Sequence, residues 1–285
     1  MASNLRLEAL FEVKDRWVAI TGAGSGIGRM LARGCTVNGA NTILIDVNER
    51  SLEETKTELQ ELSQSGDLSP TSVVTEAGVT AVVAAIKSIR GSLDALIHCA
   101  AVRYMNEVTY KPGGSLGDLE DATMSAPYQG WEQTFRLNVL APYYLTAGLV
   151  RLLGTAAAKG DGRGCVLMLS SPASVHNHQF VPCYQTSKAA VDHLVRIMAA
   201  EFADYYIRVN GISPGIVPSG MTTTDANSNL HLAAEAPAGR AGNEDDMVGT
   251  MLWLISKAGA FMDGKVVRVE GGRLLILRGA TCHSG

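Results

Sequence analysis

The sequence lacks an excess of basic residues, a long apolar run and paired cysteines. Its 285 residues carry a formal net charge of −4, so no excess of positive charge indicates binding to nucleic acid or to an anionic membrane. The opening "MASNLRLEALFEVKDRW" mixes charges into every turn, so we expect no signal peptide, and no later apolar run reaches membrane length. The five cysteines include no CxxC pair, which favours free thiols in a reducing compartment over disulfides or a metal site. We therefore expect a cytoplasmic protein with neither nucleic acid, membrane nor metal as a partner.

Repeats, low-complexity blocks and linkers are also absent, and the 46% hydrophobic content is enough for a sizeable core. Short β-rich apolar runs alternate with amphipathic helical patterns. The runs lie at 16–20, 42–46, 71–75, 93–98, 165–170, 206–212 and 265–272. Strands flanked by helices at this rhythm predict an α/β fold, a doubly wound parallel sheet covered on both faces, in a single domain over 1–285.

Two polar segments break this rhythm, at 103–128 and 213–242. Both follow predicted strands, and loops at the carboxyl ends of parallel strands line the ligand crevice of such folds. We expect the first to be an insertion and the second to be a substrate loop, and both to form walls of the substrate-binding site. Mobile surface loops would give the same sequence pattern. Residues 273–285 are interpreted as a tail.

A glycine cluster lies between the first predicted strand and helix. It reads Thr21-Gly22-x-x-x-Gly26-x-Gly28, which differs from the general G-x-G-x-x-G spacing. A tight turn alone would explain it, but its position favours a dinucleotide pyrophosphate resting on the helix N-terminus.

Asp46 ends the second predicted strand, eighteen residues after Gly28. A carboxylate there can bind both ribose hydroxyls and repel a 2′-phosphate, which favours NAD over NADP. Helix capping near Asn48 is the alternative role. Arg29 follows the glycine turn and could reach a phosphate, so NADP stays open.

The stretch "PCYQTSKAA" (182–190) places Tyr184 and Lys188 four positions apart, after a proline suited to a helix entrance. A phenol and an ammonium would then project from one helical face. On local grounds alone, an exposed surface pair is the better reading.

These motifs together resemble the short-chain dehydrogenase/reductase family, over about 14–272. The resemblance rests on T-G-x-x-x-G-x-G at 21–28, "RLNVLAPYY" with Asn138, "LSS" ending a strand, Y-x-x-x-K at 184–188, "NGISPG" at 210–215 and a terminal "VVRVEGG". It implies a Rossmann-type fold and an NAD(P)-dependent oxidoreductase. Such an enzyme transfers a hydride between nicotinamide and the carbonyl or alcohol of a small molecule.

The resemblance also implies catalytic roles. Tyr184 would be the general acid/base, and Lys188 would stabilise its phenolate and hold the nicotinamide ribose. Ser171 would hydrogen-bond the substrate oxygen, while strand alternation should turn Ser170 the other way. Asn138 would hold a water in the proton path, although a helix kink or cap is as good a local reading.

The cofactor-binding residues implied in the same way fall on the glycine turn, the second and fourth strands and the loop after "PG". They are Gly22, Gly24, Ser25, Gly26, Ile27, Gly28, Asp46, Ala100, Lys188, Pro214, Gly215, Val217 and Ser219. Ser219 would bind the nicotinamide carboxamide. The "PSxMT" form of its loop is similar to that of 3-ketoacyl reductases of the rhamnolipid type and their fungal relatives, which points to specialised metabolism.

The family usually has N-N-A-G after the fourth strand. This chain has His98-Cys99-Ala100-Ala101 at that place. We expect His98 and Cys99 to be repacked core residues rather than a catalytic pair, and the extra methyl of Ala101 to shift the cofactor. The family's aspartate near the adenine is also absent, and Thr75 and Glu76 are both candidates for its place.

Two other functions compete with a carbonyl reductase. One is a reductase of a C=N bond, possibly coupled to a cyclisation, in alkaloid-type biosynthesis. It is suggested by the unusual His98–Ala101 stretch, the 103–128 insertion and Arg136. A non-enzymatic NAD sensor is the other, and the intact Ser171, Tyr184 and Lys188 argue against it. By resemblance we expect a homodimer or homotetramer that packs its two middle helices.

Overall fold

The computed structural model describes residues 4–63, 71–74, 78–111, 113–177, 179, 181–219 and 229–277. Within these, one seven-stranded parallel sheet has the order β3-β2-β1-β4-β5-β6-β7. Its strands are β1 (Trp17–Thr21), β2 (Asn41–Ile45), β3 (Thr71–Val74), β4 (Ala95–His98), β5 (Cys165–Leu169), β6 (Arg208–Pro214) and β7 (Val266–Val269). The expected doubly wound sheet is confirmed, and its order reverses between β1 and β4, where such folds bind ligands.

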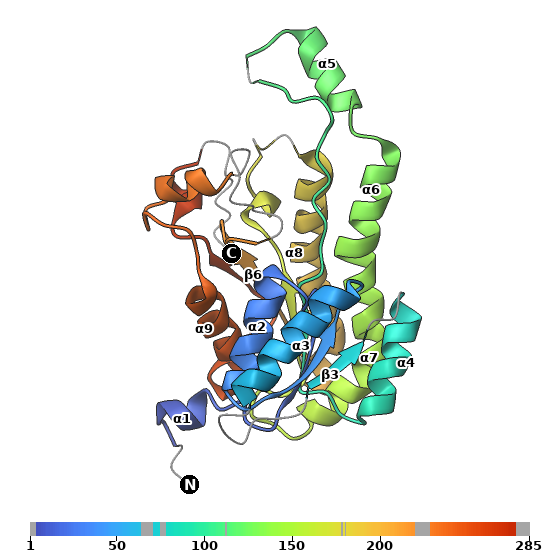
Figure 1. Ribbon diagram of the computed structural model, residues 1–285, viewed down its shortest axis with the longest axis vertical. Coiled ribbons are helices and arrows are strands. Elements are labelled where there is room, and N and C mark those ends of the chain that lie inside the picture. Colours follow the sequence, from blue (N-terminus) through green and yellow to red (C-terminus); the bar gives the residue numbers. More distant parts are fainter. Residues whose placement is uncertain are drawn as a thin grey trace.

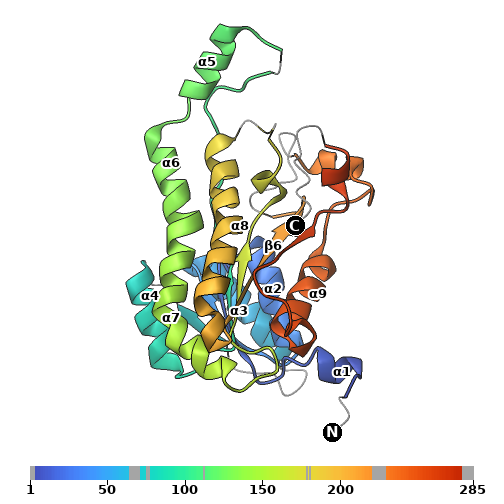
Figure 2. The same cartoon turned by 180° about the vertical axis from the view of Figure 1, so that it is seen from behind.

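Helices cover both faces of the sheet (Figures 1 and 2). One layer holds α2 (Gly26–Val37), α3 (Glu49–Ser63) and α9 (Glu244–Ile255), and the other holds α4 (Val79–Ile89), α7 (Ala141–Ala157) and α8 (Pro182–Phe202). The remaining helices are α1 (Leu7–Leu10), α5 (Leu116–Met124) and α6 (Tyr128–Phe135), a π-helical turn η1 (Arg136–Leu140), and the 3₁₀ turns η2 (Pro172–Ser174), η3 (Ala203–Tyr205), η4 (Asn229–Glu235), η5 (Lys257–Gly259) and η6 (Arg273–Leu275).

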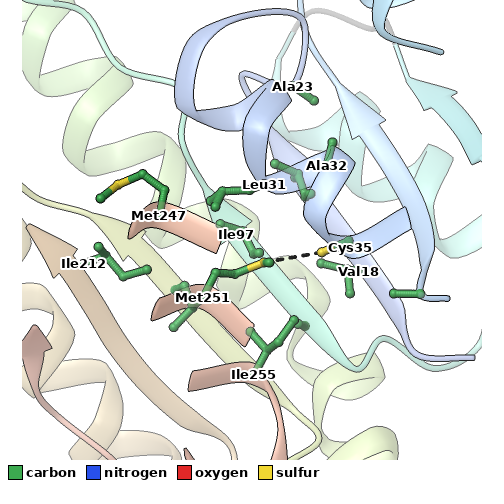
Figure 3. Close-up of a cluster of buried hydrophobic side chains, with 14 of the residues drawn as sticks. Val18, Ala23, Leu31, Ala32, Cys35, Ile97, Ile212, Met247, Met251 and Ile255 are labelled. Atoms are coloured by element: carbon green, nitrogen blue, oxygen red, sulfur yellow. Dashed lines mark hydrogen bonds between the residues drawn. The ribbon is translucent and has the colours of Figure 1, made fainter. Parts of the chain in front are cut away.

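Successive side chains of the strands feed two separate cores. Val18 and Ile20 of β1 join the core under α2, α3 and α9, whereas Ala19 joins the core under α4, α7 and α8. Both sides of each strand are therefore apolar, as expected for a parallel sheet. In the first core the Cys35 thiol of α2 lies 3.4 Å from the Met251 sulfur of α9 (Figure 3).

Local signals start the helices where the sequence predicts them. The Asn48 side chain accepts a hydrogen bond from Ser51 N at 3.0 Å, so it caps α3 as expected. Asn243 and Asp246 form a reciprocal capping box at the start of α9. Strand β6 begins two residues later than expected, because Tyr206 takes a left-handed backbone conformation (φ 56°) that ends the preceding turn.

The helix through Tyr128–Ala157 corrects one expectation. It has 30 residues, and 18 consecutive residues within it have a mean hydropathy of 1.2, so by length and composition it could cross a membrane. No unbroken apolar run announces this, because Glu132, Arg136 and Arg151 interrupt it. In the fold its α7 part packs as a core helix, with Leu145, Leu149 and Leu153 buried against the sheet.

The segment after β4 divides into two parts. Its first residues stay at the carboxyl edge of the sheet, and α5 then projects beyond the rest of the described chain (Figures 1 and 2). This projecting helix was not predicted from the polar 103–128 stretch. The Asn106 amide donates to Ala122 O at 2.8 Å, which ties α5 back to the strand-to-helix loop.

Candidate active site

The turn between β1 and α2 requires its glycines. Gly22 and Gly26 have φ of +69° and +51°, where side chains other than glycine are strained. A Cβ on Gly22 would lie 2.8 Å from Ala100 N, and one on Gly28 would lie 2.1 Å from Gly22 O. The Thr21 hydroxyl accepts hydrogen bonds from Cys99 N and Ala100 N, both at 3.2 Å. The turn is thereby locked to the end of β4, with the N-terminus of α2 behind it.

The Asp46 carboxylate lies against this turn. Its Oδ2 accepts from Gly24 N at 3.0 Å, and its Oδ1 accepts from Asn48 N at 3.0 Å. Arg29, which could have served a 2′-phosphate, donates from Nε to Glu58 Oε2 at 2.7 Å. A tight glycine turn at a helix N-terminus, with a carboxylate at the end of β2, fits the phosphate and ribose requirements of a dinucleotide.

Tyr184 and Lys188 are not a surface pair. Pro182 begins α8, and the Lys188 ammonium lies 5.6 Å from the centre of the Tyr184 ring. Lys188 is only 3% exposed, and its Nζ donates to Leu169 O, at the end of β5, at 2.7 Å. The helix and the strand together hold the cation in the interior.

Burial shifts the pKa of both groups. It lowers the pKa of Lys188 to about 8, while Cys99 and the Asp192 carboxylate act in the opposite direction. Burial also raises the pKa of Tyr184, opposed by its hydrogen bond with Ser171 and by the charge of Arg103. At neutral pH the phenol is therefore protonated and the lysine mostly charged.

The two serines after β5 diverge, as strand alternation predicts. The Ser171 hydroxyl accepts from Ala173 N at 3.2 Å and is hydrogen-bonded with Tyr184. The Ser170 hydroxyl instead donates to the Asp192 carboxylate of α8. Ser171 is thus the serine beside the tyrosine.

Asn138 lies within the π-helical turn between α6 and α7. Its Oδ1 accepts from Val102 N at 2.9 Å, and its Nδ2 donates to Val102 O at 2.9 Å and to Ser187 Oγ at 3.1 Å. The side chain joins the loop after β4 to α8. π-Helical turns recur at functional sites and also kink helices, so this geometry agrees with both readings of Asn138.

The unusual residues His98 and Cys99 at the end of β4 have different surroundings. His98 is buried, its Nε2 lies 2.9 Å from Thr146 Oγ1, and burial lowers its pKa to about 3, so it is a neutral core residue as expected. Cys99 differs, because it is half-buried and lines the cavity beside Lys188. Burial raises the pKa of its thiol, with Lys188 opposing that shift.

A cavity of about 520 Å³ brings the candidate residues together. Those predicted from the sequence and found on its wall are Ile27, Ser171, Tyr184, Lys188, Pro214, Gly215, Val217 and Ser219. Both polar segments contribute, the first through Arg103 and Met105 and the second through Leu232. The expected substrate walls are therefore present in part, because no residue of α5 is among the described lining residues. α5 instead projects beyond the rest of the described chain (Figures 1 and 2).

Sequence reasoning missed several residues of the cavity wall, namely Arg103, Met105, His176, Gln179, Arg273 and Leu277. Arg103 follows β4 at the sheet's carboxyl edge, a position that could have marked it. Arg273 had been assigned to the tail. Thr75, Glu76 and Cys282 lie outside the described residues.

A doubly wound sheet with a dinucleotide turn and a Ser–Tyr–Lys cavity defines a nicotinamide-dependent oxidoreductase. The family described as enoyl-(acyl carrier protein) reductase matches residues 22–273. The chain is 32% identical over 284 residues to the short-chain dehydrogenase/reductase PhomF' of Diaporthe leptostromiformis, with 94% of each chain covered. It therefore belongs to the short-chain dehydrogenase/reductase family and is an NAD(P)-dependent oxidoreductase.

Two bacterial proteins are also similar. The rhamnolipids biosynthesis 3-oxoacyl-[acyl-carrier-protein] reductase of Pseudomonas aeruginosa is 32% identical over 269 residues, which is 92% of this chain and 97% of that one. The Pseudomonas aeruginosa RhlG/NADP active-site complex superposes with a TM-score of 0.78 at 27% identity, covering 93% and 98% of the two chains.

Proposed function

We propose that this enzyme interconverts the carbonyl and the alcohol of a small molecule, with NAD(H) as its cofactor, Asn138, Ser171, Tyr184 and Lys188 as its catalytic residues, and a role in specialised metabolism. The observation that carries the proposal is the shared cavity wall of Ser171, Tyr184 and Lys188. When bound, the nicotinamide supplies or accepts the hydride. The likeness to a rhamnolipid biosynthesis reductase supports the metabolic role.

The side chains divide the proton chemistry between them. In the reduction direction the Tyr184 hydroxyl donates its proton to the carbonyl oxygen, and its raised pKa keeps that proton in place at neutral pH. Ser171 donates a hydrogen bond to the same oxygen as negative charge develops there. The Lys188 ammonium, close to the ring, stabilises the phenolate left behind and binds the nicotinamide ribose.

For Asn138 we propose a role in returning protons to Tyr184. Its amide is fixed by bonds to Val102 and Ser187. The π-helical turn that carries it leaves backbone carbonyls outside the regular ladder, where a water can bind. Such a water would connect the buried lysine with solvent.

The preference for NAD(H) rests on Asp46. Its carboxylate is held at the glycine turn, while Arg29 is paired with Glu58. A 2′-phosphate would meet a like charge there and lose the ribose contact. Dissociation constants for NADH and NADPH should favour NADH, and Asp46→Ala should narrow the difference. Tighter NADPH binding by the unchanged protein would overturn this preference.

Two of the residues that suggested the C=N alternative lie outside the cavity wall. His98 is a core residue bonded to Thr146, and Arg136 is exposed on the surface. Tyr184→Phe separates the two reactions, because an iminium substrate accepts hydride without a protonated phenol.

We expect Tyr184→Phe to reduce turnover of ketones by about a hundredfold or more, with NADH affinity retained. Tyr205→Phe, at an exposed position, is the matched control and should leave turnover unchanged. Retained turnover of a cyclic imine by Tyr184→Phe would favour the C=N reaction. Ketone reduction that survives the substitution would contradict the proposal.

We also propose a homo-oligomer built on the middle helices. Leu140, Tyr143 and Tyr144 are exposed apolar residues along η1 and α7, and Ile197 is exposed on α8. Light scattering at micromolar concentration tests this, and a strict monomer would contradict it.

A further inference from the structure

The cavity beside Tyr184 is lined by cations, although the whole chain is acidic. Arg103, Lys188 and Arg273 all lie on its wall. Among the described residues that line it, none is an aspartate or a glutamate. The chain as a whole carries a net charge of −4, so this polarity is local to the cavity. Clefts of one sign concentrate ligands of the other.

Arg103 lies within electrostatic reach of the reacting position. It follows β4 by five residues, at the carboxyl edge of the sheet where ligands bind in this fold. Arg103 and Tyr184 line the same cavity, and the positive charge of Arg103 opposes the burial-driven rise in the Tyr184 pKa. A group bound by Arg103 would therefore lie in the cavity that holds the carbonyl protonated by Tyr184.

Arg273 reaches the same cavity from a different element. It begins η6, which follows β7, and its Nη1 donates to Leu232 O in η4. This bond fixes the guanidinium on the wall made by the second polar segment. An arginine has five N–H donors, so one backbone contact leaves it able to bind a ligand.

We propose that the substrate carries a carboxylate near its reacting carbonyl and that Arg103 binds this carboxylate. The inference rests on the proposed carbonyl reduction and names its substrate class as oxo acids. A guanidinium matches a carboxylate in a bidentate, charge-assisted pair, which orients as well as attracts. Arg273 adds a second positive charge to the wall of the same cavity.

The test compares each oxo acid with its neutral ester. We would measure kcat/KM for 2-, 3- and 4-oxohexanoate and for their methyl esters with NADH. The variants are Arg103→Met and Arg103→Lys, with Arg151→Met, an exposed position on α7, as the matched control. Arg103→Lys keeps the charge and safeguards against a folding defect in Arg103→Met.

The unchanged protein should prefer at least one acid over its ester by about ten- to a hundredfold, the effect of one charge-assisted hydrogen bond. Arg103→Met should erase the preference by raising KM for the acid, with the ester changed less than about twofold. Arg103→Lys should keep part of the preference, and Arg151→Met all of it.

Each alternative outcome of this experiment has a different consequence for the proposal. Equal rates for acid and ester would overturn the oxo-acid assignment while leaving carbonyl reduction intact. A preference for phosphopantetheine thioesters that Arg103→Met does not change would also overturn it, assigning the charge of Arg273 rather than that of Arg103 to a carrier phosphate. If no carbonyl compound is reduced, the proposed function fails, and calorimetric titration of hexanoate into the NADH complex decides the anion site. Binding lost in Arg103→Met supports the site, and no binding overturns it.

Discussion

At the scale of single residues, the cavity depends on a lysine kept charged in a dry place. Burial pulls the Lys188 pKa down to about 8, so its cation is retained only narrowly above neutral pH. The Asp192 carboxylate, one turn further along α8, raises the Lys188 pKa. The Ser170 hydroxyl donates a hydrogen bond to that carboxylate. Ser170 therefore serves the site indirectly, through a partner that holds the charge on Lys188.

Asp192→Asn should move the alkaline loss of NADH affinity to lower pH. Removing the carboxylate lowers the Lys188 pKa below about 8, so the ammonium is lost earlier as pH rises. We expect a displacement of roughly one pH unit in a plot of NADH dissociation constant against pH. The amide still accepts the Ser170 bond, which preserves the local packing. Asp204→Asn, at an exposed position beyond α8, is the control, and an unmoved profile in Asp192→Asn would contradict the role.

At the scale of elements, the strands and long helices follow from local pattern. Apolar runs and capping residues located β1, β2, β5 and α3 to within a residue or two. α5 was missed although it begins at a local capping box of Ser115 and Asp118, whereas the π-helical turn depends on contacts between segments distant in the chain. The Asn138 amide bonds to Val102, thirty-six residues away.

The residues of the site also fall into those that local pattern predicts and those placed by packing between distant segments. Ser171, Tyr184 and Lys188 lie on a strand end and a helix start, so their spacing predicts their proximity. Arg103 and Arg273 lie on connections whose course is set by packing against other elements. The residues proposed for chemistry could thus be predicted one by one from the sequence. Arg103 was covered only by the prediction that 103–128 walls the site, and Arg273 was not predicted.

Helix packing supports a prediction of its own at Gly34. A Cβ there would lie 2.5 Å from a Val248 methyl, so α2 and α9 approach through this glycine. Gly34→Ala gains about 1 kcal/mol of helix propensity but overpacks a stiff β-branched neighbour at a cost of roughly 1–3 kcal/mol. We expect a lower free energy of unfolding in urea. Val248→Ala in the same chain should restore it, and additive effects of the two changes would contradict the contact.

At the scale of the whole molecule, the buried bases Lys188 and His98 are held in opposite charge states. Lys188 stays charged at the carboxyl edge of the sheet, where the cavity opens. His98 stays neutral inside the core, bonded to Thr146 of α7, where the family pattern has an asparagine. A neutral imidazole joins β4 to α7 as an amide would, but it makes the fold sensitive to acid.

This sensitivity gives a stability prediction with a definite sign. The folded pKa of His98 is about 3, against an ordinary value of 6.5, so between these the unfolded chain binds more protons than the folded one. Stability is therefore lost as pH falls below 6.5, by at most about 1.4 kcal/mol per pH unit from this residue. His98→Asn should lose less stability between pH 6.5 and pH 4.5 in urea unfolding, even if it is less stable at pH 7. His193→Asn, at an exposed position on α8, should run parallel to the unchanged protein. Parallel curves for His98→Asn as well would show that His98 is not held neutral in the core.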